Sequence, residues 1–246
     1  EIIGKLIAEH INDGDTIQLG IGGIPNAVAR QLMNKKDLGI HTEMFTTGMM
    51  HLIKALVVTG LKKNVNKGKH VTAFAFGTPE LYEFLNDNPS VYFMRGREGN
   101  DPAIIGLNDN MVSINTTLEI DLTGQCASES IGHVQFSGTG GQSDTAIGAQ
   151  NSKNGRSFIA LYSTAMVKNP ETGIREEISK IVTFLKPGAA VSLSRNDVDF
   201  VVAEYGCVSL RGTTIDERAR LLISIAHPKF RDELTKEAIK YGYIGV

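Results

Sequence analysis

Cysteine, proline and long hydrophobic runs are scarce in this sequence. Its 246 residues include only 2 Cys and 7 Pro. Cys126 and Cys207 show no CxxC spacing and no grouping with other metal-ligating residues, which argues against a disulfide scaffold and a metal site. We therefore expect a reduced, cytoplasmic protein. The apolar stretch 52–60 contains Lys54, and no run of about 18 uncharged apolar residues exists, so we expect no membrane span.

A large excess of charge of one sign is also missing. The 25 Lys+Arg nearly balance the 27 Asp+Glu, which removes the usual electrostatic case for a nucleic-acid binder. With 41% hydrophobic and 21% charged residues, the chain has enough apolar material for a sizeable core, and disorder is excluded. The length fits one large domain or two modest ones. No secretory signal peptide is visible, and because the sequence begins at Glu1 we expect it to be part of a longer polypeptide.

Short apolar runs alternate with longer amphipathic segments along the chain. Most short runs are rich in Val, Ile, Phe or Thr and are bounded by Gly, Asn or Asp, which is typical of strands. Their alternation with helices indicates an α/β fold with an open, mainly parallel sheet flanked by helices. We expect 1–246 to form one domain, with 167–177 as a flexible surface excursion. The expected strands are 16–19, 39–42, 71–76, 91–94, 111–114, 118–122, 157–162, 181–184, 190–193 and 200–203. The expected helices are 2–11, 25–33, 48–58, 79–86, 215–225 and 228–240.

Three helix starts carry their own sequence signals. Pro25 and Pro228 suit the first position of a helix, where a missing N–H costs nothing. Thr214 and Glu217 have the Thr-x-x-Glu spacing of a capping box ahead of an apolar run. These residues predict where the corresponding helices begin.

The segment 18–25 is rich in glycine and lies between an expected strand and an expected helix. Without Cβ atoms, Gly20, Gly22 and Gly23 allow a ligand to approach the backbone closely, and the helix N-terminus offers N–H groups to an anion. A dinucleotide fingerprint, G-x-G-x-x-G, would need a glycine where Pro25 stands. The segment therefore predicts either an anion-binding turn or a plain tight turn.

Glu43 lies in the segment 41–48, at the carboxyl end of an expected strand. Ligands of open α/β sheets bind beyond the carboxyl ends of the strands. A glutamate carboxylate in such a place can act as a base, a metal ligand or a nucleophile. The alternative is an exposed or helix-capping glutamate. We expect the neighbouring His41 to be structural.

The segment 137–144 is a second loop of small residues. Its backbone N–H groups can form an oxyanion hole, and the alternative is a flexible loop.

Taken together, these segments resemble the C-terminal half of the acetyl-CoA hydrolase/transferase family, whose CoA-transferases include the 4-hydroxybutyrate enzymes. The resemblance runs from Ile2 to Tyr243 and implies a CoA-transferase-like fold (NagB/RpiA/CoA-transferase-like). It makes 1–246 the C-terminal catalytic domain of an enzyme whose N-terminal domain is absent here and whose active-site cleft lies between the two. The segments that carry it are 20–27, 39–44, 108–115, 121–125, 138–144, 194–199, 204–206 and 210–212.

The resemblance implies that Glu43 is the nucleophile of a ping-pong CoA transfer. CoA would move from a short-chain acyl-CoA (4-hydroxybutyryl-, butyryl- or acetyl-CoA) to a carboxylic acid such as acetate, through a glutamyl-CoA thioester on Glu43. Contacts with CoA are implied for Gln18, Leu19, Gly20, Ile21, Gly22, Leu118, Gly140 and Gly141.

The implied partners are acyl-CoA and small carboxylic acids, in a cytoplasmic homodimer without nucleic acid, membrane or metal. CoA enters as a substrate, and no permanently bound cofactor is implied. The chain departs from the family at Thr145, where the pattern G-G-Q-x-D-F has an aromatic residue, so we expect an altered acyl pocket. Two alternatives remain open: an acyl-CoA hydrolase, in which water intercepts the intermediate, and a non-catalytic CoA- or nucleotide-binding module.

Overall fold

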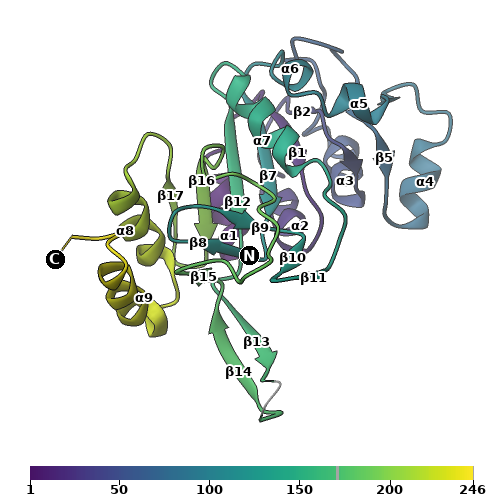
Figure 1. Cartoon of the computed structure of the whole chain (residues 1–246). Coiled ribbons are helices and arrows are strands. Elements are labelled where there is room, and N and C mark those ends of the chain that lie inside the picture. The colour runs from purple at the N-terminus through teal and green to yellow at the C-terminus, as the bar shows by residue number, and fades with distance from the viewer. Residues whose placement is uncertain (170–171, 246) are drawn as a thin grey trace. The chain divides into compact units, whose positions relative to one another are not determined.

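The structure is a computed structural model that describes residues 1–169 and 172–245 (Figure 1). The chain divides into two compact units. The first contains residues 1–115 and 141–158, and the second contains the remainder of the described chain.

The sheet of the first unit is built around β1 (Thr16–Leu19). This strand pairs in parallel with β2 (Gly39–Ile40) on one side and with β7 (Met111–Thr116) on the other, and β12 (Arg156–Ala160) follows β7 in the strand order. Every residue of β1 is buried, as expected for a parallel strand that is covered on both faces. The expected α/β fold with a mainly parallel sheet is confirmed.

The helices of the first unit pack closely where a glycine lies at the contact. A Cβ atom on Gly4 of α1 would lie 2.9 Å from the carbonyl carbon of Ala27 in α2, so glycine allows these two helices to approach. A Cβ on Gly148 of α7 would lie 2.6 Å from Ile105 of α6 in the same way. The helices are α1 (Ile2–Ala8), α2 (Gly23–Gln31), α3 (Thr47–Lys54), α4 (Pro79–Leu85), α5 (Gly96–Gly99), α6 (Pro102–Ile105) and α7 (Gln142–Asn151).

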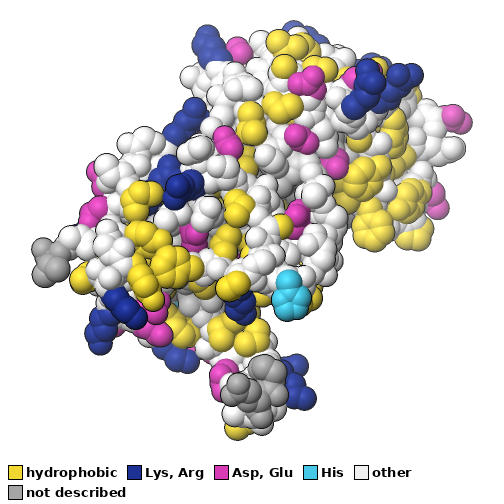
Figure 2. Space-filling view, in the orientation of Figure 1, with side chains coloured by type: hydrophobic (Ala, Val, Ile, Leu, Met, Phe, Trp, Pro, Cys, Tyr) yellow, Lys and Arg dark blue, Asp and Glu magenta, His cyan; other side chains and the backbone are white. Residues whose placement is uncertain are grey.

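Two further parallel strand pairs lie beyond the end of β2. They are β3 (Met44–Phe45) with β5 (Phe74–Ala75), and β4 (His70–Thr72) with β6 (Val91–Phe93). A bridge between His41 and Val71 connects the end of β2 to β4. Figure 2 shows hydrophobic side chains gathered over β5 and α4, where several aromatic residues are exposed. These residues are Phe74, Phe76, Tyr82, Tyr92 and Phe93.

The second unit combines short sheets with two helices. Strand β8 (Glu119–Asp121) pairs in parallel with β15 (Ile181–Val182) and antiparallel with β9 (Cys126–Ala127). Helices α8 (Ile215–Ile225) and α9 (Pro228–Lys240) pack side by side (Figure 1). Three antiparallel hairpins complete the unit: β10 (Ser130–Ile131) with β11 (Val134–Gln135), β13 (Thr164–Lys168) with β14 (Arg175–Ser179), and β16 (Phe200–Ala203) with β17 (Gly206–Ser209).

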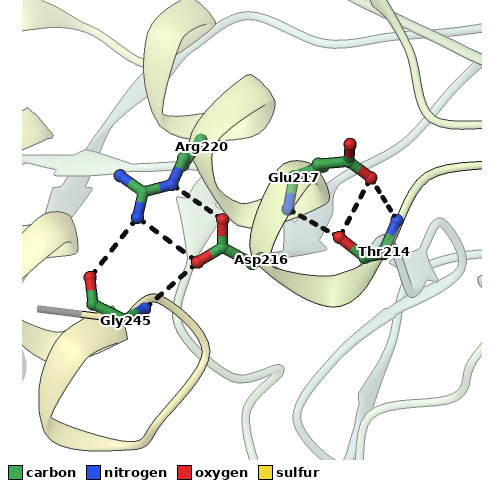
Figure 3. Close-up of polar contacts among 5 residues, drawn as sticks. All are labelled: Thr214, Asp216, Glu217, Arg220 and Gly245. Atoms are coloured by element: carbon green, nitrogen blue, oxygen red, sulfur yellow. Dashed lines mark hydrogen bonds and ion pairs between the residues drawn. The ribbon is translucent and has the colours of Figure 1, made fainter.

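The predicted capping box at the start of α8 is confirmed. Thr214 Oγ1 accepts a hydrogen bond from the Glu217 backbone N–H at 3.3 Å, and Glu217 Oε2 accepts one from the Thr214 N–H at 2.7 Å (Figure 3). Asp216 in the same turn accepts hydrogen bonds from the Arg220 side chain and the Gly245 N–H. The limits of α8 and α9 agree with those predicted, and Pro228 does occupy the first turn of its helix.

Other elements differ from the sequence-based prediction. Helix α2 begins at Gly23, so Pro25 is its third residue; its missing N–H is still one that would have no partner within the helix. Residues 190–193 form no strand, and only an isolated bridge joins Leu193 to Cys126. No helix was predicted over 142–151, and residues 142–144 were assigned to a loop, but the segment forms α7; its short polar side chains hide the helical pattern.

The expected surface excursion at 167–177 contains the facing ends of β13 and β14, and residues 170–171 lie outside the described part. No helix within residues 1–169 and 172–245 is both long and apolar enough to cross a membrane. Among the described residues, neither Cys126 nor Cys207 forms a disulfide bond.

Candidate active site

Glu43 lies between β2 and β3, where hydrogen bonds fix its backbone. The Glu43 carbonyl accepts hydrogen bonds from the backbone N–H groups of Ala73 at 2.9 Å and Phe74 at 3.1 Å. It also accepts a hydrogen bond from the Thr72 hydroxyl at 3.0 Å. One residue earlier, the Thr42 N–H donates to the Val71 carbonyl at 3.0 Å. The segment that joins β4 to β5 therefore positions Glu43, as expected for a residue beyond the carboxyl end of a parallel strand.

The Glu43 carboxylate contacts the second glycine loop. Its Oε2 atom accepts a hydrogen bond from the Gly141 N–H at 2.9 Å, at the N-terminal cap of α7. Among the described residues, Oε1 of Glu43 has no hydrogen-bond partner. A half-buried carboxylate that is anchored by one oxygen and unbound at the other is suited to nucleophilic attack.

A side chain at position 141 would have to displace the side chains of Glu43 and Asn100. A Cβ atom there would lie 2.5 Å from Glu43 Oε2 and 2.6 Å from Asn100 Nδ2. Glu43 and Asn100 therefore both flank Gly141. The backbone at Gly141 has a φ of −99°, which any residue can adopt, so the constraint comes from these two side chains alone.

Negative charge is concentrated around Glu43. Asp144 lies in the first turn of α7, and its pKa is raised by burial and by the nearby carboxylates of Glu43 and Asp101. The N-terminal end of α7 partly offsets this repulsion because its free N–H groups carry partial positive charge.

His41 is part of the hydrogen-bonded core beneath the site. Its Nε2–H donates to the Gly99 carbonyl at 2.8 Å, and burial lowers the pKa of His41 to about 4. The imidazole is therefore neutral at pH 7, which agrees with a structural role.

The side chains of Gln18 and Leu19 are both buried beneath the first glycine loop. Gln18 is 4% exposed. Its Oε1 accepts a hydrogen bond from the Ser113 hydroxyl at 2.8 Å, and its Nε2 donates one to Asn115 Oδ1 at 3.1 Å. Thr145 is only 2% exposed and joins the same network through Ser113 and Asn115. The Thr145 hydroxyl therefore fills a polar core position, whereas an effect on the acyl pocket stays a prediction.

The accessible part of the first glycine loop follows Leu19. The Gly20 N–H donates to the Ile114 carbonyl at 2.8 Å, whereas the Ile21 side chain is 65% exposed. Gly22 caps α2 with a φ of +113°, a conformation that favours glycine, and open space surrounds it. A ligand at this turn would meet the backbone of residues 21 and 22 rather than the side chains of residues 18 and 19.

The other predicted CoA contacts differ in their surroundings. Gly140 is exposed and has a φ of +58°, and it directly precedes Gly141. Leu118 belongs to the second unit, where its N–H donates to the Ala127 carbonyl at 3.0 Å ahead of β8. Of the predicted residues, the structure brings Glu43 and Gly141 into direct contact.

Asn100 was not identified from the sequence as a site residue. It follows the short helix α5 and reaches Gly141 only through the folding of distant segments, so no local pattern marks it. In the part of the chain that the structure describes, no group of three His, Cys, Asp or Glu residues is placed to hold a metal ion.

Comparison with known proteins identifies the family. Residues 77–238 match the model of the acetyl-CoA hydrolase/transferase C-terminal domain. The chain is 51% identical over 244 residues to succinyl-CoA:cyclohexane-1-carboxylate CoA transferase of Geobacter metallireducens, covering 99% of this chain and 54% of that protein. It is 50% identical over 235 residues to 4-hydroxybutyrate coenzyme A transferase of Clostridium kluyveri, covering 96% and 53%.

A solved structure is similar to this chain over almost its whole length. RipA from Yersinia pestis matches with a TM-score of 0.90 and 44% sequence identity over 99% of this chain and 53% of that one. The chain spans about half the length of the curated relatives that it matches. The motifs around Glu43 and Gly141, the fold and these matches together show that the chain belongs to the acetyl-CoA hydrolase/transferase family, as a C-terminal domain.

Proposed function

We propose that this chain is the catalytic half of a CoA-transferase and that Glu43 is its nucleophile. The observation that carries the proposal is the Glu43 carboxylate, with Oε2 bound to the Gly141 N–H and Oε1 unbound among the described residues. The two relatives that are 51% and 50% identical to this chain over the aligned residues are both named as CoA transferases, which supports the reaction class.

The proposed reaction begins when Glu43 attacks the thioester carbonyl of an acyl-CoA. The C–S bond breaks, leaving an acyl-glutamyl anhydride and CoA thiolate. The thiolate then attacks the Glu43 carbonyl of the anhydride, which releases the free carboxylate and leaves a glutamyl-CoA thioester. A second carboxylate reverses both steps and leaves as the new acyl-CoA. The chemistry needs no metal or redox group.

Each step passes through a tetrahedral intermediate with a negatively charged oxygen. If Oε1 attacks, Oε2 becomes the carbonyl oxygen of the glutamyl anhydride, and we propose that the Gly141 N–H, which already binds Oε2, stabilises its negative charge when the thiolate adds. One well-placed donor lowers such a barrier by about 3–4 kcal/mol. The carboxylate is a weak nucleophile, so interactions with the long CoA molecule help to drive the attack.

We propose CoA contacts along Gln18–Gly22, at Gly140 and Gly141, and at Leu118. Gln18 and Leu19 are only 4% and 2% exposed as whole residues, so the accessible part of this stretch is at Gly20, Ile21 and Gly22. The proposed substrates are short-chain acyl-CoAs such as 4-hydroxybutyryl-, butyryl- and acetyl-CoA, with acetate or a similar acid as acceptor. A cytoplasmic homodimer, with 1–246 acting as one catalytic domain, belongs to the same proposal.

Replacing Glu43 by glutamine tests the proposal in the intact polypeptide that contains this chain. The amide keeps the size of the side chain but cannot form the anhydride, so transfer of CoA from butyryl-CoA to labelled acetate should fall at least about 1000-fold. The matched control is Glu83→Gln on the exposed side of α4, which should leave the rate unchanged.

The same assay separates the proposed reaction from its alternatives. Release of free CoA without formation of labelled acetyl-CoA would indicate a hydrolase instead. A wild-type protein that is thermally stabilised by NAD but not by CoA, and that catalyses neither reaction, would indicate a binding module. Near wild-type transfer by the Glu43→Gln protein would refute the assignment of Glu43.

A further inference from the structure

A buried lysine of the first unit contacts β2, the strand that precedes Glu43, without belonging to the proposed chemistry. Lys63 is only 3% exposed, and within residues 1–169 and 172–245 it forms no ion pair with a carboxylate. Burial of a charged ammonium group is costly unless hydrogen bonds compensate it. Burial lowers the pKa of Lys63 to about 8.

The Lys63 ammonium group binds two backbone carbonyls that belong to neighbouring strands. Nζ donates to the Ile40 carbonyl at 2.9 Å and to the Lys69 carbonyl at 2.9 Å. Ile40 is the last residue of β2, and Lys69 directly precedes β4. Lys63 therefore joins β2 to the start of β4, one residue before His41 and two residues before Val71, which form the bridge between the strands.

These two strands lead directly to the residues that hold Glu43. Glu43 follows Ile40 by three residues, and its carbonyl is bound by Thr72, Ala73 and Phe74, which end β4 and begin β5. A shift of one strand against the other would move the Glu43 carboxylate away from the Gly141 N–H.

The surroundings of Lys63 are arranged to receive it. A Cβ atom on Gly39 would lie 2.6 Å from Lys63 Cγ, so glycine in β2 leaves the space for the lysine side chain. The buried Asn108 Oδ1 accepts hydrogen bonds from the N–H groups of Asn64 at 3.2 Å and Val65 at 3.3 Å, which fixes the loop that carries Lys63. Asn108 is the first residue of the segment 108–115, and the proposed reaction assigns it no role.

We infer that Lys63 is a positioning residue, which holds the β2–β4 junction so that the Glu43 carboxylate stays against Gly141. The inference rests on the proposed function for its effect on the rate. The claim that Lys63 holds β2 and β4 together depends only on the hydrogen bonds of Lys63.

Lys63→Met is the direct test, because methionine fills a similar volume but cannot donate to the two carbonyls. In the intact polypeptide we expect kcat for CoA transfer to fall about 10- to 100-fold, while KM for acyl-CoA changes less than twofold. Amide hydrogen exchange at Thr42, Ala73 and Gly141 should accelerate at least tenfold, while amides of α9 keep their protection. Lys62→Met, at the exposed neighbouring residue, is the matched control and should change none of these values.

Gly39→Ala is a second variant, which keeps Lys63 but displaces its side chain, and it should show the same pattern with smaller changes. Unchanged kcat and unchanged exchange at Thr42, Ala73 and Gly141 in Lys63→Met would overturn the inference. Loss of protection throughout α9 in both variants would also overturn it, because Lys63 would then serve global stability. If wild-type protein and Glu43→Gln show the same transfer rate, the proposed function fails, while the hydrogen-exchange results still decide the role of Lys63.

Discussion

At the scale of single residues, burial and hydrogen bonding separate the predicted site residues that are accessible from those that lie in the core. The resemblance gave Glu43 as a nucleophile and Gly141 as a CoA contact, and the structure brings the two residues into contact. Gln18 and Leu19 were predicted in the same way, but their side chains form part of the core. A sequence motif marks a position as important without distinguishing a ligand contact from the support beneath it.

Gly141→Ala tests the contact at this scale. The added methyl group would lie 2.5 Å from Glu43 Oε2, so the carboxylate must move away from the N–H that holds it. We expect the transfer rate to fall about 100-fold, because a displacement of about 1 Å is enough to cost that factor.

Gly138→Ala is the control for this substitution, since nothing lies within 4 Å of a Cβ atom at Gly138. Steady-state kinetics and circular dichroism measure the rate and the fold of both proteins. A Gly141→Ala protein with the wild-type rate would show that the contact between residues 43 and 141 is unimportant for catalysis.

At the scale of helices and strands, elements with strong local signals were predicted correctly, and elements that depend on long-range contacts were not. The capping box of Thr214 and Glu217 fixes the start of α8, and the predicted limits of α8 agree with the structure. By contrast, α7 has almost no amphipathic pattern, because it is built from small and polar residues. Its packing against α6 is a contact that the local sequence does not indicate. The expected strand at 190–193 has apolar residues but only one bridge to a neighbour.

Thr214→Ala measures what the capping box contributes. It removes the hydroxyl oxygen that accepts a hydrogen bond from the Glu217 N–H, which is one of the two reciprocal hydrogen bonds of the capping box in Figure 3. We expect the free energy of unfolding in guanidinium chloride to fall by about 1 kcal/mol, with the transfer rate unchanged. Thr214→Ser retains a hydroxyl and should lose much less; equal losses in the two variants would contradict the capping explanation.

At the scale of the whole molecule, the sequence was sufficient to identify the fold class and the family. Alternating strands and helices indicated a mainly parallel α/β sheet, and the ordered set of glycine and acidic motifs indicated the acetyl-CoA hydrolase/transferase family. Asn100 and Lys63 were not found, because their contacts join segments that are far apart in the chain and neither residue lies in a recognisable motif. The chain spans about half of its curated relatives, so its activity is best tested in the intact polypeptide.

The central claim is that Glu43 carries CoA during the reaction, and one measurement tests it most directly. The polypeptide is incubated with butyryl-CoA without an acceptor acid, treated with borohydride, digested and examined by mass spectrometry. A glutamyl-CoA thioester on Glu43 should be reduced to an alcohol at that residue alone, and prior addition of acetate should decrease the yield. An unmodified Glu43 in a preparation that actively transfers CoA would contradict the account.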